Sequence, residues 1–110
     1  MKVHLVKELT IIDYAEKNAS GSASFTKWII LLKKARWDIP EDIVKTFNSA
    51  DLLGNGSERA VFNIGGNKYR MICKYFFGKL KVHLYVCWIG THAEYDKICN
   101  MNEQYTVNRF

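Results

Sequence analysis

The amino-acid sequence predicts a small α+β protein built on one antiparallel sheet. The chain has 110 residues, which is the size of one domain, and 48% of them are apolar, enough for a core without disulfide or metal support. The first half shows helical spacing of apolar residues, and the second half alternates polar with apolar ones. We therefore expect a single domain over residues 1–110, in which N-terminal helices cover an N-terminal strand plus a three-strand meander and a short helix follows.

The first half begins with a short strand. Residues 2–5 alternate polar and apolar side chains, the period of a half-buried strand. A helix should follow, because apolar residues then recur at helical spacing until a run of small polar residues interrupts them at 18–22. The positions that carry this spacing are Leu9, Ile12, Ala15 and Ala19.

Two further helices are expected before the meander. The second helix should start at Ser24, and a third should run from Pro40 to Phe47, where proline and two acidic residues suit a first turn. Residues 51–57 have the composition of a turn. The apolar face of the second helix, which we interpret as the one that covers the sheet, consists of Phe25, Trp28, Ile29, Leu32 and Ala35.

The second half is expected to form three consecutive strands over residues 60–64, 68–77 and 80–89. The first turn is Gly65-Gly66-Asn67, whose residues tolerate positive φ, and the second is Gly78-Lys79. Alternation assigns the middle strand one face with Lys68, Arg70, Ile72, Lys74 and Phe76 and another with Tyr69, Met71, Cys73, Tyr75 and Phe77. In the last strand it groups Val82, Leu84, Val86 and Trp88 apart from Lys81, His83, Tyr85, Cys87 and Ile89. One face of the sheet should therefore be rich in cations.

The positive charge of the chain lies in this second half. The formal net charge is +5, and residues 62–90 contain five Lys or Arg, seven aromatic residues and no Asp or Glu. Cations mixed with aromatic side chains favour an anionic partner such as a nucleic acid. Solubilising surface lysines, which also protect sheet edges from aggregation, are the plain structural alternative.

Several other functions have no support in the sequence. Cys73, Cys87 and Cys99 form an odd set without a C-x-x-C pair, which fits buried thiols in a reducing compartment rather than a disulfide framework. His4, His83 and Cys residues lack the spacing of a metal site, and we expect both histidines to be structural and no cofactor to be needed. Neither a phosphate-binding glycine loop nor a G-x-S-x-G motif occurs. Without an export signal or membrane span, we expect a cytoplasmic protein.

A helix should begin directly after the last strand, because Thr91 and Glu94 form a capping-box pattern. That helix would carry His92, Tyr95 and Asp96 on one side of its first turn. RNA cleavage without a metal ion needs a base for the 2′-OH, an acid for the leaving 5′-oxygen, and cations for the charge that gathers on phosphorus. The sequence offers groups of each kind at this end of the sheet.

Each candidate catalytic residue has a functional and a structural interpretation. Arg70 could bridge two phosphate oxygens, or it could be an ordinary surface cation. His92 suits either proton transfer, because imidazole exchanges protons near neutral pH, or it could be a tolerated helix residue. Tyr95 could orient the nucleophile, act as a base if a cation lowers its pKa, stack on a base, or belong to the core.

Two segments of the second half resemble the signature of the HigB toxin family. They are Val61-Phe62-Asn63-Ile64-Gly65-Gly66-Asn67-Lys68-Tyr69-Arg70 and Ile89-Gly90-Thr91-His92-Ala93-Glu94-Tyr95-Asp96-Lys97-Ile98. The resemblance implies a RelE-like fold and a toxin of a type II toxin–antitoxin system that cleaves messenger RNA, usually on the translating ribosome. It also implies a HigA-type helix-turn-helix antitoxin as partner, through which the complex would contact DNA, and no membrane partner.

The resemblance also implies roles for individual residues. The first segment would place Asn67, Lys68 and Arg70 at the edge that faces RNA, and the second would supply His92, Tyr95 and Lys97. From the cationic strand face, independently of the resemblance, we add Lys74 as an RNA-binding residue. Asp96 is either the orienting partner of His92 or a surface charge. Two rival functions stay open at this point: a toxin of similar fold that binds its target without cleaving RNA, as ParE-like relatives poison DNA gyrase, and a plain RNA-binding protein.

Overall fold

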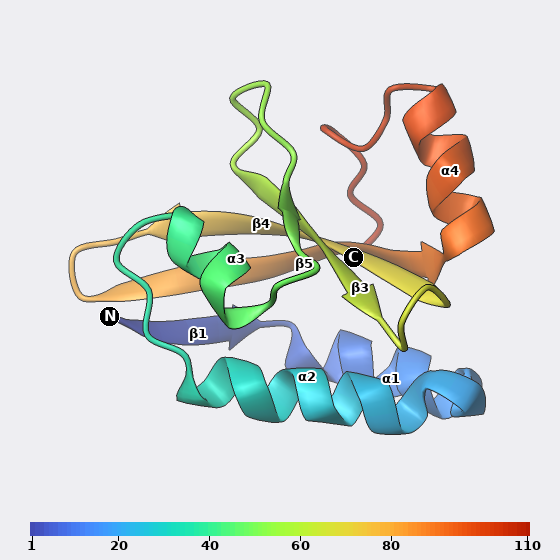
Figure 1. Ribbon diagram of the computed structural model, residues 1–110, viewed down its shortest axis with the longest axis horizontal. Helices are drawn as coiled ribbons and strands as arrows, with labels where there is room; N and C mark the ends of the chain where they lie inside the picture. The colour runs from blue at the N-terminus through green and yellow to red at the C-terminus, as the bar shows by residue number, and fades with distance from the viewer.

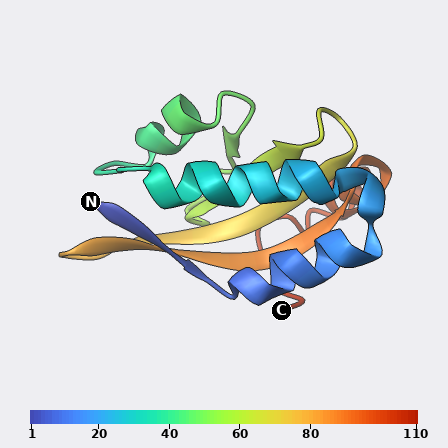
Figure 2. The same ribbon diagram turned by 90° about the horizontal axis from the view of Figure 1, so that it is seen from below.

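The computed structural model describes residues 1–110 and places five strands in one sheet, with helices on both of its faces (Figures 1 and 2). The strand order is β1-β5-β4-β3-β2. This architecture confirms the α+β class that the sequence predicts. The elements are β1 (Lys2–Val6), α1 (Glu8–Lys17), the short 3₁₀ helix η1 (Ala19–Gly21), α2 (Ser22–Lys34), α3 (Glu41–Thr46), β2 (Asp51–Leu52), β3 (Arg59–Ile64), β4 (Tyr69–Phe77), β5 (Lys81–Thr91) and α4 (His92–Asn100).

The sheet differs from the expected one at both edges. β1 runs parallel to β5, so the sheet is mixed and only the β2–β5 part is antiparallel. Alternation of side chains reveals a strand but not its direction, and the long connection from β1 to β5 imposes no hairpin. At the other edge, residues 51–52 pair with β3 as β2, where the sequence predicts only a turn. Two residues are too few to produce a visible alternation.

The helices α1 and α2 cover one face of the sheet, which we call the inner face (Figure 2). The predicted face of α2 is confirmed, because all five of its apolar residues are buried. In α1 the buried residues are Ile11 and Ala15, whereas Leu9 is 72% exposed, so its assignment to the core face is wrong. Ala19 lies in η1 and is exposed. The chain reverses tightly after α1, and Gly21 is required there because a Cβ atom would lie 2.5 Å from the ring of Tyr69.

A bulge in the β4–β5 pairing reverses the alternation of β5. Cys73 pairs with Val86 and Ile72 pairs with Trp88, so Cys87 is left as an extra residue. Beyond this point Trp88 points away from the inner face and Ile89 points into it. The predicted grouping of Trp88 with Val86 is therefore wrong, because strict alternation cannot anticipate a bulge.

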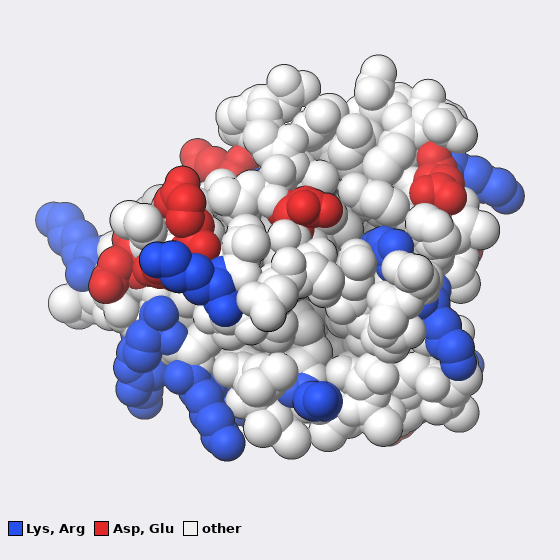
Figure 3. Space-filling view, in the orientation of Figure 1, with Lys and Arg blue, Asp and Glu red and all other residues white.

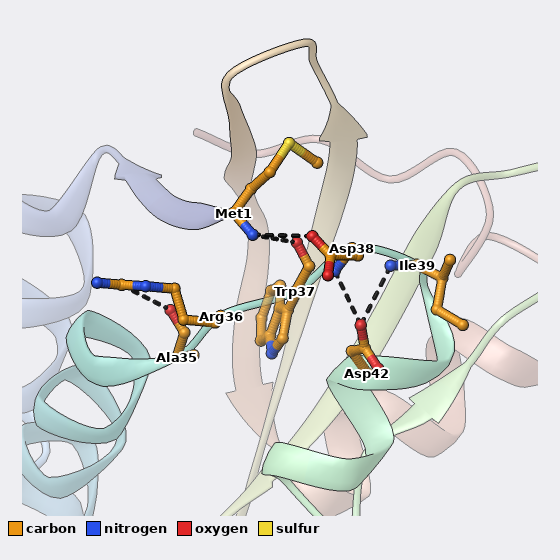
Figure 4. Close-up of polar contacts among 7 residues, drawn as sticks. All are labelled: Met1, Ala35, Arg36, Trp37, Asp38, Ile39 and Asp42. Carbon is orange, nitrogen blue, oxygen red and sulfur yellow. Dashed lines mark hydrogen bonds and ion pairs between the residues drawn. The ribbon is translucent and has the colours of Figure 1, made fainter.

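The loop before α3 is held by polar contacts (Figure 4). The carboxylate of Asp42 accepts hydrogen bonds from the backbone N–H groups of Asp38 and Ile39, at 2.8 and 3.2 Å. These two bonds are the main cause of the lowered pKa of the Asp42 carboxyl group. The amino group of Met1 lies 3.0 Å from an Asp38 carboxylate oxygen, which joins this loop to the start of β1.

The other face of the sheet, which we call the outer face, is divided into two halves. Over its covered half, α4 and residues 101–110 enclose a small apolar cluster. Its open half lies on β1, β5 and β4 toward the β4–β5 hairpin and has no helix over it (Figure 1). The covered half is built around Val61, Ile72, Cys87, Trp88 and Ile98. The open half carries His4, Lys74, Phe76, Lys81, His83 and Tyr85.

Residues 101–110 are attached to the outer face by Arg59. Its guanidinium donates hydrogen bonds to the carbonyl oxygens of Gln104 and Val107, at 3.2 and 2.6 Å. The backbone N–H of Arg109 also donates to the carbonyl of Cys87 at 2.8 Å. Arg59 is buried, so these carbonyls compensate for the loss of hydration of its charge.

The three cysteines are free thiols, of which Cys73 and Cys87 are buried, as predicted, and Cys99 is partly exposed. Burial raises the pKa of the Cys73 thiol well above its usual value. No helix in the structure is long and apolar enough to cross a membrane.

Candidate functional site

The two motif segments lie side by side at one end of the sheet. The antiparallel pairing of β4 with β5 sets Tyr69 opposite Thr91 and Arg70 opposite Gly90. The backbone N–H of His92 then donates a hydrogen bond to the carbonyl of Lys68 at 3.0 Å. Segments about 20 residues apart in the sequence therefore form one site.

The start of α4 is fixed by the predicted capping box. The Thr91 hydroxyl accepts from the backbone N–H of Glu94 at 3.2 Å, and the Glu94 carboxylate accepts from the backbone N–H of Thr91 at 2.8 Å. These reciprocal bonds set the position of the next residue, His92, relative to the sheet. The preceding Gly90 is also constrained, because a Cβ atom there would lie 2.4 Å from the ring of Trp88.

Arg70 lies on the outer face and is only 8% exposed, so it is not an ordinary surface cation. Its guanidinium donates to the carbonyl of Tyr69 at 3.1 Å and to the side-chain oxygen of Asn67 at 3.4 Å. None of the ion pairs in the structure includes Arg70. A guanidinium has five N–H donors. Arg70 therefore keeps both its charge and unused donors for an anion.

His92 and Asp96 form a pair on the exposed side of α4. The Nδ1 atom of His92 lies 3.7 Å from a carboxylate oxygen of Asp96 one turn later. Both side chains are at least half exposed, so the pair adds little to stability. The geometry brings Asp96 close enough to attract a charged imidazole, and both interpretations of Asp96 stay predictions.

Tyr95 is a poor candidate for a general base. Burial raises its pKa well above the usual value, and a hydrogen bond with Cys99 and the charge of Asp51 act in the same direction. The positive charge of Arg70 acts the other way but does not reverse the shift. The Tyr95 ring also packs 6.2 Å from that of Trp88. Positioning, stacking or a structural role suits this side chain better than proton abstraction.

The predicted RNA-binding residues are only partly brought together. Asn67 and Lys68 are exposed in the β3–β4 turn beside Arg70, and Figure 3 shows basic side chains between this turn and α4. Lys74 lies four residues further along β4, about 13 Å away by strand geometry, in the open half. Lys97 follows His92 by five residues, which turns it roughly 140° around the helix axis. Lys74 and Lys97 are therefore not part of this site.

The site is an open surface rather than a deep pocket. None of the hollows in the surface is lined by Arg70 or His92. The adjacent turn does border a hollow of about 250 Å³, lined among others by Lys27, Asn63 and Gly66. No group of three or more His, Cys, Asp and Glu side chains comes together in residues 1–110 as a metal site. The donor set is suited to an extended anionic ligand.

Comparison with known proteins assigns the family. Residues 22–98 match the HigB toxins, described as the RelE-like toxic component of a toxin–antitoxin system. The chain is 30% identical over 94 residues to the mRNA interferase toxin HigB of Escherichia coli K12, which covers 86% of this chain and 88% of the relative. It is 23% identical over 96 residues to the mRNA interferase HigB of Escherichia coli O6:H1, covering 87% and 91%. The chain belongs to the HigB toxin family.

The match to the HigB toxins contains the whole of the candidate site. Residues 22–98 include both motif segments, the helix α2 that supports the sheet, and most of α4. The resemblance seen in the sequence is thus confirmed at the level of the family. As a HigB toxin, the chain is the toxic component of a toxin–antitoxin pair. The match assigns the family but gives no role to any individual residue.

Sequence reasoning missed two features of this HigB-family chain. Arg59 has no motif around it, and only the fold shows that it anchors residues 101–110 over the covered half. The second is the contact between His4 and His83, whose rings lie 5.9 Å apart on the open half because β1 pairs with β5; their structural role stays a prediction. No sequence signal gives that pairing, since the two residues are 79 positions apart.

Proposed function

We propose that this chain is an endoribonuclease toxin that cleaves messenger RNA by attack of a 2′-OH on the adjacent phosphodiester. The main supporting observation is Arg70, a nearly buried guanidinium without an acidic partner, on the strand that the backbone N–H of His92 joins through the Lys68 carbonyl. The printed names of its relatives, mRNA interferases, support the same activity. The proposed reaction breaks the P–O5′ bond and leaves a 2′,3′-cyclic phosphate and a 5′-hydroxyl.

Arg70 would bind the two non-bridging oxygens of the scissile phosphate. Its donors are aimed by the Tyr69 carbonyl and the Asn67 amide, so little reorganisation is needed when negative charge builds up on phosphorus. Lys68 adds a mobile positive charge from the same turn. Together these cations supply the charge stabilisation that a metal ion provides in other nucleases.

His92 would carry out one of the two proton transfers, with Asp96 orienting its ring. The second transfer is left without an assigned group in this chain, since the raised pKa of Tyr95 makes its phenol a poor base and the residue is partly buried. We infer that water or the ribosome supplies it and that the toxin acts on translating messenger RNA. Its open site, which no cavity encloses, fits a substrate presented by a larger particle.

We propose in addition that a HigA-type antitoxin with a helix-turn-helix domain neutralises the toxin and that the complex contacts DNA only through that partner. The resemblance of the two motif segments to the HigB signature supports this assignment, as does membership of a toxin–antitoxin family. A neighbouring reading frame with a helix-turn-helix pattern, and rescue of growth when it is co-expressed, would test it.

The activity can be tested by brief induction of the toxin in cells, followed by mapping of transcript 5′ ends. Wild-type protein should produce new 5′ ends inside coding regions and arrest growth, and His92→Ala should abolish both. Lys34→Ala, at an exposed position in the last turn of α2, is the matched control and should behave as wild type. Growth arrest with intact messages and a DNA-damage response would instead identify a gyrase-poisoning toxin.

A further inference from the structure

The open half of the outer face combines exposed rings with unpaired cations. None of the side chains named for it is a carboxylate, and neither Lys74 nor Lys81 takes part in an ion pair. Exposed acidic residues gather elsewhere, around α3, as the upper left of Figure 3 shows. This distribution favours a polyanion over a protein surface of mixed charge.

The rings of the open half, which we call the platform, cluster around His83, with that of His4 nearly perpendicular to it at 89°. Its imidazole lies 5.9 Å from the ring of His4, 6.0 Å from that of Phe76 and 6.3 Å from that of Tyr85, with an angle of 21° between the planes of the last pair. Phe76 is 53% exposed and Tyr85 is 39% exposed. Aromatic faces left open beside cations are the combination on which unpaired bases stack while phosphates contact lysines.

A hollow of about 420 Å³ adjoins this platform. Phe76 and Tyr85 line it together with Lys7 and Lys74, and Phe110 from the C-terminal segment forms part of its wall. Its volume lies in the range of sites that hold a small organic group, so a nucleobase fits. The rings would contact the base, and the two lysines would contact the phosphates of the RNA backbone on either side of it.

We propose that the open half binds an unpaired stretch of messenger RNA that flanks the segment held at Arg70. This inference rests on the proposed function and adds a second contact region to it. Lys74 and Arg70 lie on the same face of β4, about 13 Å apart, so one RNA strand can reach both. The platform binds bases by stacking, which is tolerant of sequence, and therefore holds the RNA without selecting the cleavage site.

The test is binding of a short fluorescent 2′-O-methyl RNA of mixed A and U sequence, which cannot be cleaved because it has no free 2′-OH. Fluorescence anisotropy would measure its affinity for the full chain over a range of salt concentrations. Phe76→Ala combined with Tyr85→Ala should weaken binding by at least about tenfold, because two stacking surfaces are lost. Lys74→Ala combined with Lys81→Ala should lower the slope of log K against log salt by about 1.4.

Two exposed positions away from the outer face provide matched controls. Leu9→Ala removes an exposed apolar side chain from α1, and Lys34→Ala removes a lysine from α2. Both variants should bind the RNA as wild type does. Arg70→Ala should lose cleavage and also weaken binding of the uncleavable RNA, because it removes a phosphate contact, but binding should be weakened less than by the Phe76/Tyr85 double variant.

The outcomes separate the two proposals. If wild type cleaves messenger RNA but the Phe76/Tyr85 variant binds the oligonucleotide as tightly as wild type, the platform is wrong and the proposed function stands. If the variant binds RNA normally but sediments as a different oligomer, the face is an interface between copies, and the inference is overturned. If wild type neither cleaves nor binds RNA, both proposals fail.

Discussion

The two halves of the outer face share strands β4 and β5, yet their cationic side chains differ in burial and in hydrogen bonding. In the covered half, Arg70 is held between backbone and amide oxygens next to an apolar cluster. In the open half, Lys74 and Lys81 extend into solvent beside exposed rings. The first arrangement fixes a charge in one place, and the second leaves charges that adjust to a ligand. Under the two proposals made above, the same strand face would provide a surface for catalysis and a surface that holds the RNA.

The difference begins at the β-bulge and ends with the C-terminal segment. The bulge turns Trp88 to the outer face, where it packs against Ile98 of α4. Residues 101–110 then follow the same face, attached by Arg59. Apolar cover lowers the local dielectric constant, so the charge of Arg70 acts more strongly on a bound phosphate than an exposed lysine does.

The largest expected effect is on stability, at Trp88. Its side chain is 2% exposed and forms the centre of the covered half, so Trp88→Ala should lower the free energy of unfolding by about 3–5 kcal/mol. Tyr85→Ala, three residues earlier in the open half, should change it by less than about 1 kcal/mol. Urea unfolding of both variants measures the difference. Equal losses would show that the two halves are not distinct in packing.

The next effect is on catalysis, at Arg70. Arg70→Ala should reduce the rate of messenger cleavage by roughly 100-fold or more, the usual cost of losing a preorganised group that stabilises the transition state. Arg70→Lys should recover only part of this loss, since an ammonium cannot bridge two oxygens. Lys74→Ala on the same strand should reduce the rate only several-fold. Single-turnover cleavage assays compare the three variants. An effect of Lys74→Ala as large as that of Arg70→Ala would contradict the separate roles proposed for the two halves.

A smaller effect is expected where the cover is attached, at Arg59. Arg59→Ala removes two hydrogen bonds from a charged donor to the carbonyls of Gln104 and Val107, and should cost about 2 kcal/mol. The C-terminal segment should then be cut faster by proteases and exchange the backbone hydrogen of Arg109 faster. Lys81→Ala in the open half is the control. Unchanged protection of the segment would mean that Arg59 does not hold it.

Local patterns in the sequence were sufficient for most elements. The capping box of Thr91 and Glu94 and the apolar face of α2 follow from residues a few positions apart, and both are confirmed. The bulge at Cys87 and the pairing of β1 with β5 depend on contacts between distant segments, which spacing does not contain. That limit explains why Trp88 was assigned to the wrong face.

The candidate site followed the same rule. The two motif segments lie side by side because strand pairing joins their ends, and the roles of Arg70 and His92 stay predictions. Burial decides how two residues are interpreted. It distinguishes Arg70 from the other cations of its strand, and it raises the pKa of Tyr95 so that this residue is unsuitable as a base. The sequence left burial of Tyr95 as one alternative and did not predict that of Arg70, because the cover comes from α4 and the C-terminal segment rather than from the strands themselves.

The smallest expected effect is on the pH dependence of stability, at Tyr95 on the border of the covered half. Because burial raises its pKa above the usual tyrosine value of about 10, the unfolded chain loses this proton at lower pH than the folded one. The stability that Tyr95 contributes is therefore complete below about pH 10 and decreases as the pH rises further.

Tyr95→Phe should thus weaken the decline of thermal stability above pH 10. Part of the decline should persist, because burial also raises the pKa of Tyr14 and Tyr75. Near neutral pH the variant should cleave messenger RNA at a rate within a few-fold of wild type, since the hydroxyl keeps its proton there. Thermal melts between pH 8 and 11 and cleavage assays measure the two effects. A loss of cleavage comparable to that of Arg70→Ala would instead show that the Tyr95 hydroxyl takes part in the reaction.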